Sequence, residues 1–189
     1  MLEKYMCKMF NRRAGSQDSK PDEILKSLNI RSGESIADIG SGGGYYSYRF
    51  AEKAGAQGRV YAVDVKAENL AYIREEANKR GINAQLTLVL AEGENTNLPS
   101  KSLDLLFSRN AFHHISDPAR YFRKIKKALR PKARVAIIDN LREKGIMSRL
   151  GHSSSKEKIV GDMKRAGYRM ERSYDFLDQQ WFLIFSIDN

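Results

Sequence analysis

The sequence predicts an α/β protein with one doubly wound, mostly parallel sheet of seven strands and helices on both faces. Short apolar runs alternate with amphipathic segments from residue 21 to residue 139. The last forty residues instead hold two strand-like runs joined by a short turn, which predicts an antiparallel hairpin at the sheet edge. A chain of 189 residues is long enough to bury one sizeable core.

Each expected element has a local reason. The helices carry apolar residues at helical spacing and begin or end at signals such as Pro21, Gly81 and Pro131. They are expected at residues 21–28, 45–54, 67–80, 118–130 and 155–166. The strands are short apolar runs bounded by turn residues, expected at 35–39, 60–65, 84–90, 103–107, 134–139, 168–174 and 181–187. Residues 1–20 are expected to form a helical lid or cap segment, and residues 21–189 the main domain.

Composition excludes several classes of protein. The single cysteine, Cys7, excludes an intramolecular disulfide framework and a cysteine-rich zinc site. No apolar run approaches the roughly 18 residues of a membrane span, and Glu3, Lys4 and Lys8 interrupt the first ten residues, unlike a secretory signal. The expected location is therefore the cytoplasm.

The net charge of +10 is concentrated in one segment. Residues 120–149 contain eleven lysines and arginines and two acids, whereas residues 21–119 are slightly acidic. Such a patch could attract nucleic acid or an anionic lipid. A solvated helix face is the favoured interpretation, because Phe122, Ile125 and Leu129 give the same segment an apolar side to bury.

The strongest functional pattern is the glycine-rich run from Asp38 to Gly44, directly after the first strand and before a helix. Glycines let a backbone turn tightly and approach a ligand closely. A dinucleotide-binding loop would have its third glycine at residue 45, where this chain has tyrosine. The acid at position 38 would repel a pyrophosphate but would favour an ammonium group, which indicates a ligand other than NAD.

A second acid, Asp64, ends the next strand, twenty residues beyond Gly44. A carboxylate at this position can accept hydrogen bonds from both hydroxyls of a ribose. Alone it could equally be a loop or helix-capping residue, but the glycine-rich loop in register favours ribose binding.

Together these two elements resemble the class I S-adenosylmethionine (SAM)-dependent methyltransferases, which have a Rossmann-like fold. Three further segments are similar to that family's motifs: Ala91–Gly93 with Leu98–Asp104, Asn110–Ile115, and Leu129–Arg134. The pattern is most similar to the small ubiquinone/menaquinone-biosynthesis-like group with a methyltransferase type 11 core.

The resemblance implies a role for each matching residue. Asp38 would bind the cofactor's amino group, Asp64 the ribose and Val65 the adenine face, and Glu92 and Gly93 would meet the adenine edge. The backbone of the glycine-rich loop would lie close to the methionine moiety and the sugar, at Gly40, Ser41, Gly42 and Gly44. Arg109 and Asn110 would contact the methionine end. We also expect Tyr46 to line the cofactor. Ala91 and Glu92 depart from the family's Gly-Asp-Ala. The spacer of residues 94–97 before Leu98 is longer than in the commonest pattern, so Glu94 or Asn95 could make the adenine contact instead.

The expected chemistry is an SN2 transfer of the methyl group of SAM to a small-molecule acceptor. His113 or His114 could remove a proton from the acceptor, or be structural in the turn. No metal is expected, since adjacent histidines rarely converge on one ion. The alternatives are an RNA or protein methyltransferase that uses the 120–149 patch, a non-catalytic SAM-binding protein and an NAD-linked reductase. The motifs indicate neither the acceptor nor the oligomeric state.

Overall fold

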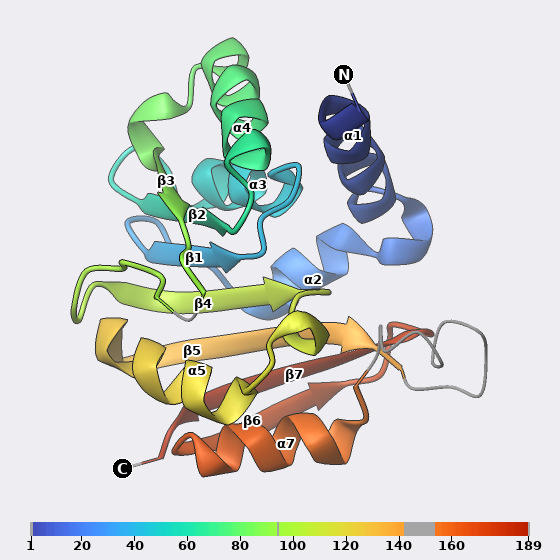
Figure 1. The fold of residues 1–189 in the computed structure, drawn as a ribbon, viewed down its shortest axis with the longest axis vertical. Helices are drawn as coiled ribbons and strands as arrows, with labels where there is room; N and C mark the ends of the chain where they lie inside the picture. The colour runs from blue at the N-terminus through green and yellow to red at the C-terminus, as the bar shows by residue number, and fades with distance from the viewer. Residues whose placement is uncertain (1, 94, 142–153, 189) are drawn as a thin grey trace. The chain divides into compact units, whose positions relative to one another are not determined.

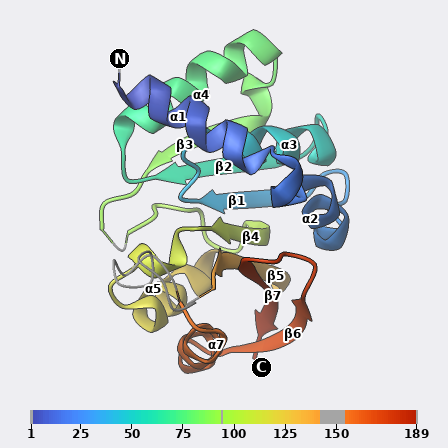
Figure 2. The same ribbon diagram turned by 90° about the vertical axis from the view of Figure 1, so that its right-hand side faces the viewer.

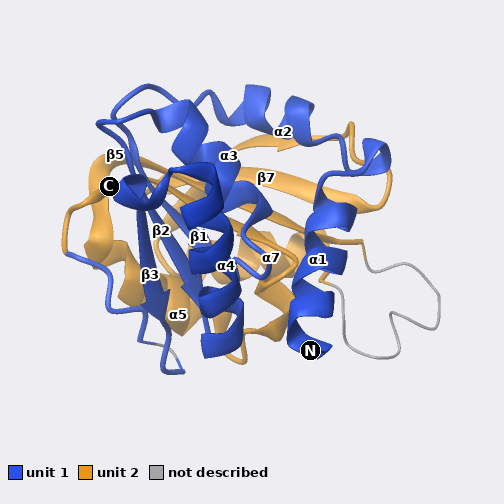
Figure 3. Ribbon diagram, turned by 90° about the horizontal axis from the view of Figure 1, so that it is seen from above, with its two compact units in different colours: residues 1–99 blue, residues 100–189 orange. Residues whose placement is uncertain are grey.

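A computed structural model describes residues 2–93, 95–141 and 154–188 of the chain. The chain divides into two compact units, unit 1 with residues 1–99 and unit 2 with residues 100–189 (Figure 3). No helix in the described ranges is long and apolar enough to cross a membrane.

Unit 1 contains three parallel strands in the order β3-β2-β1 (Figure 1). Its elements are α1 (Leu2–Ala14), α2 (Pro21–Leu28), β1 (Ser35–Ile39), α3 (Tyr45–Ala54), β2 (Arg59–Asp64), α4 (Ala67–Arg80) and β3 (Leu86–Leu90), with 3₁₀ turns at Gln17–Ser19 and Asn83–Gln85. Helices α3 and α4 pack on the strands, and α1 packs on α3 and α4 (Figure 2). Because the strands are parallel and in register, Asp38 and Asp64 lie near the same edge, at the carboxyl ends of β1 and β2.

A buried apolar cluster fixes this arrangement. Tyr48 of α3 meets Ala62 of β2 and the inner face of α4, which contributes Leu70, Ile73 and Ala77. Burial of the larger aliphatic side chains, Leu70 and Ile73, contributes about 1.5–3 kcal/mol each. The helix that follows the glycine-rich loop is therefore anchored from inside the unit, and the loop is held at both ends by buried elements.

Unit 2 contains four strands in the order β4-β5-β7-β6. Its elements are β4 (Leu103–Arg109), a 3₁₀ turn at Phe112–His114, α5 (Pro118–Ile125), a 3₁₀ turn at Lys126–Ala128, β5 (Leu129–Asn140), α7 (Lys156–Arg165), β6 (Tyr168–Tyr174) and β7 (Gln180–Ile187). Strands β4 and β5 are parallel, whereas β7 is antiparallel to both β5 and β6. The predicted C-terminal hairpin is confirmed.

One predicted element is wrong. The helix expected to run to Arg130 ends at Ile125, and Leu129 already belongs to β5. The residue before a proline is driven out of the helical region, so Arg130 could not continue a helix into Pro131. The pairing of β4 with β5 is irregular at this point, since Leu103 pairs with Leu129 but Leu105 pairs with Arg134. Pro131 lies in that irregularity, where its missing N–H costs no regular ladder bond.

Candidate functional site

The loop from Gly40 to Gly44 joins β1 to α3 and is tied to the end of β2. The amides of Gly40 and Ser41 both donate to the Val63 carbonyl, at 2.9 and 3.0 Å, and the Gly44 amide donates to the Ser41 carbonyl at 2.8 Å. Gly44 has φ +83°, and a Cβ there would lie 2.7 Å from the Tyr48 ring and 2.8 Å from Ile73. Only glycine satisfies both conditions, which explains its place at the start of α3.

Asp38 is a buried carboxylate beside this loop. It is 4% exposed, and its Oδ2 accepts a hydrogen bond from the Ser47 hydroxyl at 2.6 Å. Burial raises the pKa of the Asp38 carboxyl to about 7, and the charge of Asp64 adds to the rise while the Ser47 hydrogen bond opposes it. Asp38 forms no ion pair within the described ranges of the chain. A buried carboxylate in this state is suited to a ligand that carries a positive charge.

Ser41 gives independent evidence that a ligand completes the loop. The residue is 9% exposed, and its buried Oγ has no hydrogen-bond partner in the part of the chain that the structure describes. Buried polar groups are nearly always paired, so an orphaned hydroxyl in a glycine-rich loop points to an absent polar ligand group. SAM has an ammonium group for Asp38 and several polar atoms for the loop, so the residues present fit this cofactor.

Asp64 is 7% exposed at the end of β2, and backbone amides hold both of its oxygens. Oδ2 accepts from the Gly42 amide at 2.8 Å and Oδ1 from the Lys66 amide at 2.9 Å. These bonds orient the carboxylate and tie it to the glycine-rich loop. Each oxygen keeps a second lone pair, which leaves acceptor capacity for two ribose hydroxyls.

The predicted adenine residues lie beside the ends of β2 and β3. Val65 is 68% exposed, so its face is open to a ring that packs on it. Glu92 and Asn95 exchange two backbone hydrogen bonds of 3.0 Å around Gly93, which has φ +59°. Both side chains are exposed, so each remains a candidate for the adenine edge. Glu94, the third candidate, lies outside the described residues.

Tyr46 has a different environment from the other predicted cofactor residues. It is 5% exposed, and its ring contacts those of Tyr45 and Phe50 at centroid distances of 5.2 and 5.8 Å. Packing explains this side chain, so Tyr46 has the least structural support among the predicted cofactor residues.

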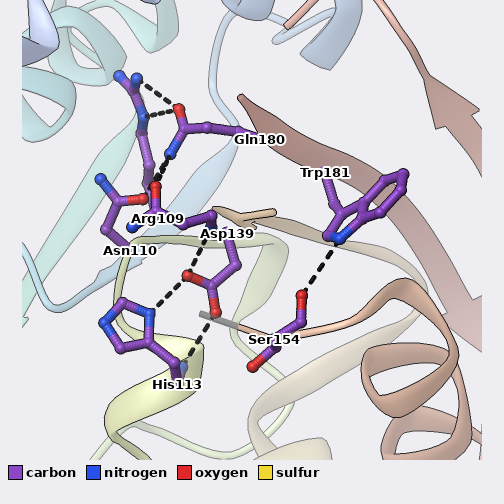
Figure 4. Close-up of polar contacts among 8 residues, drawn as sticks. Arg109, Asn110, His113, Asp139, Ser154, Gln180 and Trp181 are labelled. Atoms are coloured by element: carbon purple, nitrogen blue, oxygen red, sulfur yellow. Dashed lines mark hydrogen bonds and ion pairs between the residues drawn. The ribbon is translucent and has the colours of Figure 1, made fainter. Parts of the chain in front are cut away.

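In unit 2, Arg109 ends β4, Asn110 follows it, and both belong to a polar cluster centred on Gln180 of β7 (Figure 4). The Gln180 Oε1 accepts from Arg109 Nε at 3.3 Å and from Nη2 at 2.8 Å. Its Nε2 donates to the side-chain oxygens of Asn110, at 2.5 Å, and Asn140, at 3.0 Å. Asn110 has φ +55°, a conformation that asparagine tolerates better than most residues. Gln180 thus fixes both residues predicted to meet the methionine end.

The two adjacent histidines have different environments. The His113 side chain is 4% exposed, and its Nδ1 lies 2.6 Å from Oδ1 of Asp139, which is fully buried. Asp139 also accepts from the backbone amides of His113, at 3.0 Å, and Asn140, at 2.9 Å (Figure 4). An ionised Asp139 that accepts from His113 favours the tautomer with the proton on Nδ1 and the lone pair on Nε2. His114 is exposed and packs its ring 4.1 Å from that of His113.

Sequence reasoning missed Asp139 and Gln180. Asp139 lies one residue before the end of a buried apolar strand, as Asp38 does, and this shared pattern could have revealed it. Gln180 carries no comparable pattern. Among the described residues, no three histidine, cysteine or acidic side chains gather as a metal ion would require.

Part of the basic segment has structural roles. Arg123 donates to the Arg165 carbonyl at 2.8 Å, and Lys126 donates to the Gly167 carbonyl at 3.4 Å, both at the carboxyl end of α7. Cations are favourable at this end of a helix. Arg130 is paired with Asp104. Residues 142–149 of the patch lie outside the described residues.

Comparison with known proteins agrees with this geometry. A family model described as a methyltransferase domain, of type 11, matches residues 37–137, just over half of the chain. Phosphoethanolamine N-methyltransferase 1 of Arabidopsis thaliana is 28% identical over 120 residues, which are 64% of this chain and 24% of that protein. The ubiquinone/menaquinone biosynthesis C-methyltransferase UbiE of Cellvibrio japonicus is 24% identical over 115 residues, 61% of this chain and 46% of that protein. The chain thus matches less than half the length of these two relatives.

A solved structure extends the likeness to nearly the whole chain. A SAM-dependent methyltransferase from Aquifex aeolicus is 26% identical, with a TM-score of 0.84 and 96% of each chain covered. The predicted Rossmann-like fold class is confirmed, with three parallel strands in unit 1 and the mixed four strands of unit 2. This chain belongs to the methyltransferase type 11 family of SAM-dependent enzymes.

Proposed function

We propose that this chain transfers the methyl group of SAM to a small-molecule acceptor. The observation that carries the proposal is the buried Asp38 carboxylate beside the Ser41 hydroxyl; among the described residues, the first has no ion-pair partner and the second no hydrogen-bond partner. The family match supports the cofactor, and the relatives' names, which refer to phosphoethanolamine and to ubiquinone and menaquinone, support the acceptor class. A cytoplasmic location is part of the proposal.

In this proposal the residues of unit 1 hold the cofactor. Asp38 binds its ammonium group, Asp64 its ribose hydroxyls, and the exposed face of Val65 packs on adenine. SAM, when bound, supplies an activated methyl group on a sulfonium. The protein's contribution is then to align the acceptor with that group and to exclude water.

We favour His113 over His114 as the residue that removes the proton from the acceptor. Asp139 orients the His113 ring, and an ionised Asp139 that accepts from Nδ1–H puts the ring's lone pair on Nε2. The His113 side chain is 4% exposed, so its ring is largely shielded from water. This suits proton transfer from a weakly acidic acceptor group.

Asp64→Ala tests the cofactor assignment. The variant should bind SAM and S-adenosylhomocysteine more weakly by about 1–3 kcal/mol, because the two ribose hydroxyls lose their acceptor. Calorimetric titration of both ligands measures the change, with Glu68→Ala, an exposed acid in the first turn of α4, as the matched control. Equal affinity in Asp64→Ala and the wild type would show that Asp64 does not bind the ribose.

A further inference from the structure

The side chain of Asn11 joins helix α1 to the glycine-rich loop by hydrogen bonds. Its Nδ2 donates to the Gly43 carbonyl at 2.7 Å, and its Oδ1 accepts from the Tyr45 amide at 3.1 Å. Helix α3 begins after Gly44, which has no side chain with which to cap it. Asn11 therefore supplies from a different helix the acceptor that a capping residue normally provides.

The approach of α1 to the loop explains the glycine at position 43. A Cβ on Gly43 would lie 2.3 Å from the Cys7 carbonyl oxygen and 2.4 Å from Asn11 Oδ1. Gly43 is not among the glycines with positive φ, so contact with α1, rather than backbone conformation, excludes a side chain. Gly42 also faces this helix, since its Cβ position is 3.5 Å from the Phe10 ring.

Helix α1 is in turn fixed to α4, which it follows closely in Figure 2. Cys7 is fully buried, and its thiol donates to Asn69 Oδ1 at 3.2 Å. Two ion pairs flank this contact, Lys4 with Glu75 at 2.7 Å and Glu3 with Lys66 at 3.9 Å. The Asn11 side chain is thus presented to the loop from a helix that is anchored elsewhere in unit 1.

We propose that Asn11 is a positioning residue that holds the glycine-rich loop in its binding conformation, so that cofactor affinity depends on the docking of α1. The inference rests on the proposed function, which identifies the ligand as SAM. Gly42 precedes Gly43, the hydrogen-bond partner of Asn11. The Gly42 amide also donates to the carboxylate of Asp64. A displaced loop would therefore disturb the predicted methionine and ribose contacts together, and binding would require the loop to be ordered first.

Three variants of the full chain test this proposal. Asn11→Ala removes both hydrogen bonds to the loop and α3, Gly43→Ala forces α1 away from the loop, and Lys4→Ala removes one exposed ion pair of α1 at a point remote from the loop. Calorimetry with SAM and S-adenosylhomocysteine should show about tenfold weaker binding for each of the first two variants. Lys4→Ala should bind as the wild type does, since an exposed ion pair contributes little.

A double variant separates positioning from general destabilisation. Because Asn11→Ala and Gly43→Ala break one contact, their combination should bind no more than about twofold more weakly than Gly43→Ala alone. Independent effects would instead multiply to about a hundredfold. Multiplied losses, or Asn11→Ala affinity equal to that of the wild type, would overturn the proposal.

Hydrogen exchange distinguishes this proposal from the proposed function. Amides of residues 42–46 should exchange faster in Asn11→Ala than in the wild type or Lys4→Ala, with no ligand present. If the wild type binds neither SAM nor S-adenosylhomocysteine, the proposed function is wrong. The exchange result then still tests whether Asn11 holds the loop in place. Unchanged exchange in the loop would refute the positioning role.

Discussion

Asp38→Asn is expected to abolish detectable SAM binding and, at the same time, to stabilise the unliganded protein above neutral pH. Binding falls because the ammonium group loses its carboxylate partner, an effect of about a hundredfold or more. Stability rises because the wild type must keep a carboxylate charged while 4% exposed, next to the negative charge of Asp64. Asparagine keeps the acceptor for the Ser47 hydroxyl and carries no charge.

The pKa of Asp38 determines how the stability of the wild type changes with pH. The pKa of Asp38 is about 7 in the folded protein, raised from an ordinary value near 4. Stability contributed by the protonated carboxyl is therefore present below about pH 4 and is lost as the pH rises to 7. The loss amounts to about 4 kcal/mol at most, and Asp38→Asn avoids it.

Thermal unfolding at pH 4 and pH 8 measures this difference. The variant should unfold at a higher temperature than the wild type at pH 8, and the two should agree at pH 4. Asp64→Asn is the matched control, since backbone amides already hold that carboxylate, and it should not stabilise the protein. Wild-type SAM affinity should also fall by about tenfold per pH unit below 7. An Asp38→Asn protein that is less stable at pH 8 would contradict the account of this site.

The second large effect is expected from Asp139. Asp139→Ala leaves the His113 Nδ1–H and two backbone amides without their buried acceptor, which should destabilise the protein by about 3 kcal/mol or more. Asp139→Asn should cost less, because its oxygen can still accept from a backbone amide. Its NH₂ group would face His113, however, and would favour the tautomer protonated on Nε2.

Nitrogen-15 NMR spectra of the imidazole distinguish a change of the His113 tautomer from a loss of stability. The wild type should show the proton of His113 on Nδ1, and Asp139→Asn should show it on Nε2, with the fold retained. Asp139 is thus expected to act as a positioning residue for His113. If the His113 tautomer is the same in both proteins, Asp139 does not control the proposed base.

The sequence predicted most of the fold because most elements have their own end signals. Helix α2 begins at Pro21, and α4 ends before Gly81, as expected. The start of β5 could not be predicted in this way. Leu129 becomes a strand residue through its pairing with Leu103, and that pairing depends on a contact between distant segments.

The same distinction between local signals and long-range contacts applies to the residues of the site. Asp38 and Asp64 were predicted because an acid at the end of a buried run stands out in the sequence. Asn11 contacts the loop across more than thirty residues, and Gln180 contacts Arg109 across 71. Neither residue has a local pattern, because its role arises only when the fold brings the two segments together.

Calorimetric titration of the intact chain with SAM, S-adenosylhomocysteine and NADH is the most direct test of the central claim. The account predicts micromolar binding of the first two ligands and none of NADH, because Asp38 suits an ammonium group and opposes a pyrophosphate. Binding of NADH alone, or of none of the three, would contradict it.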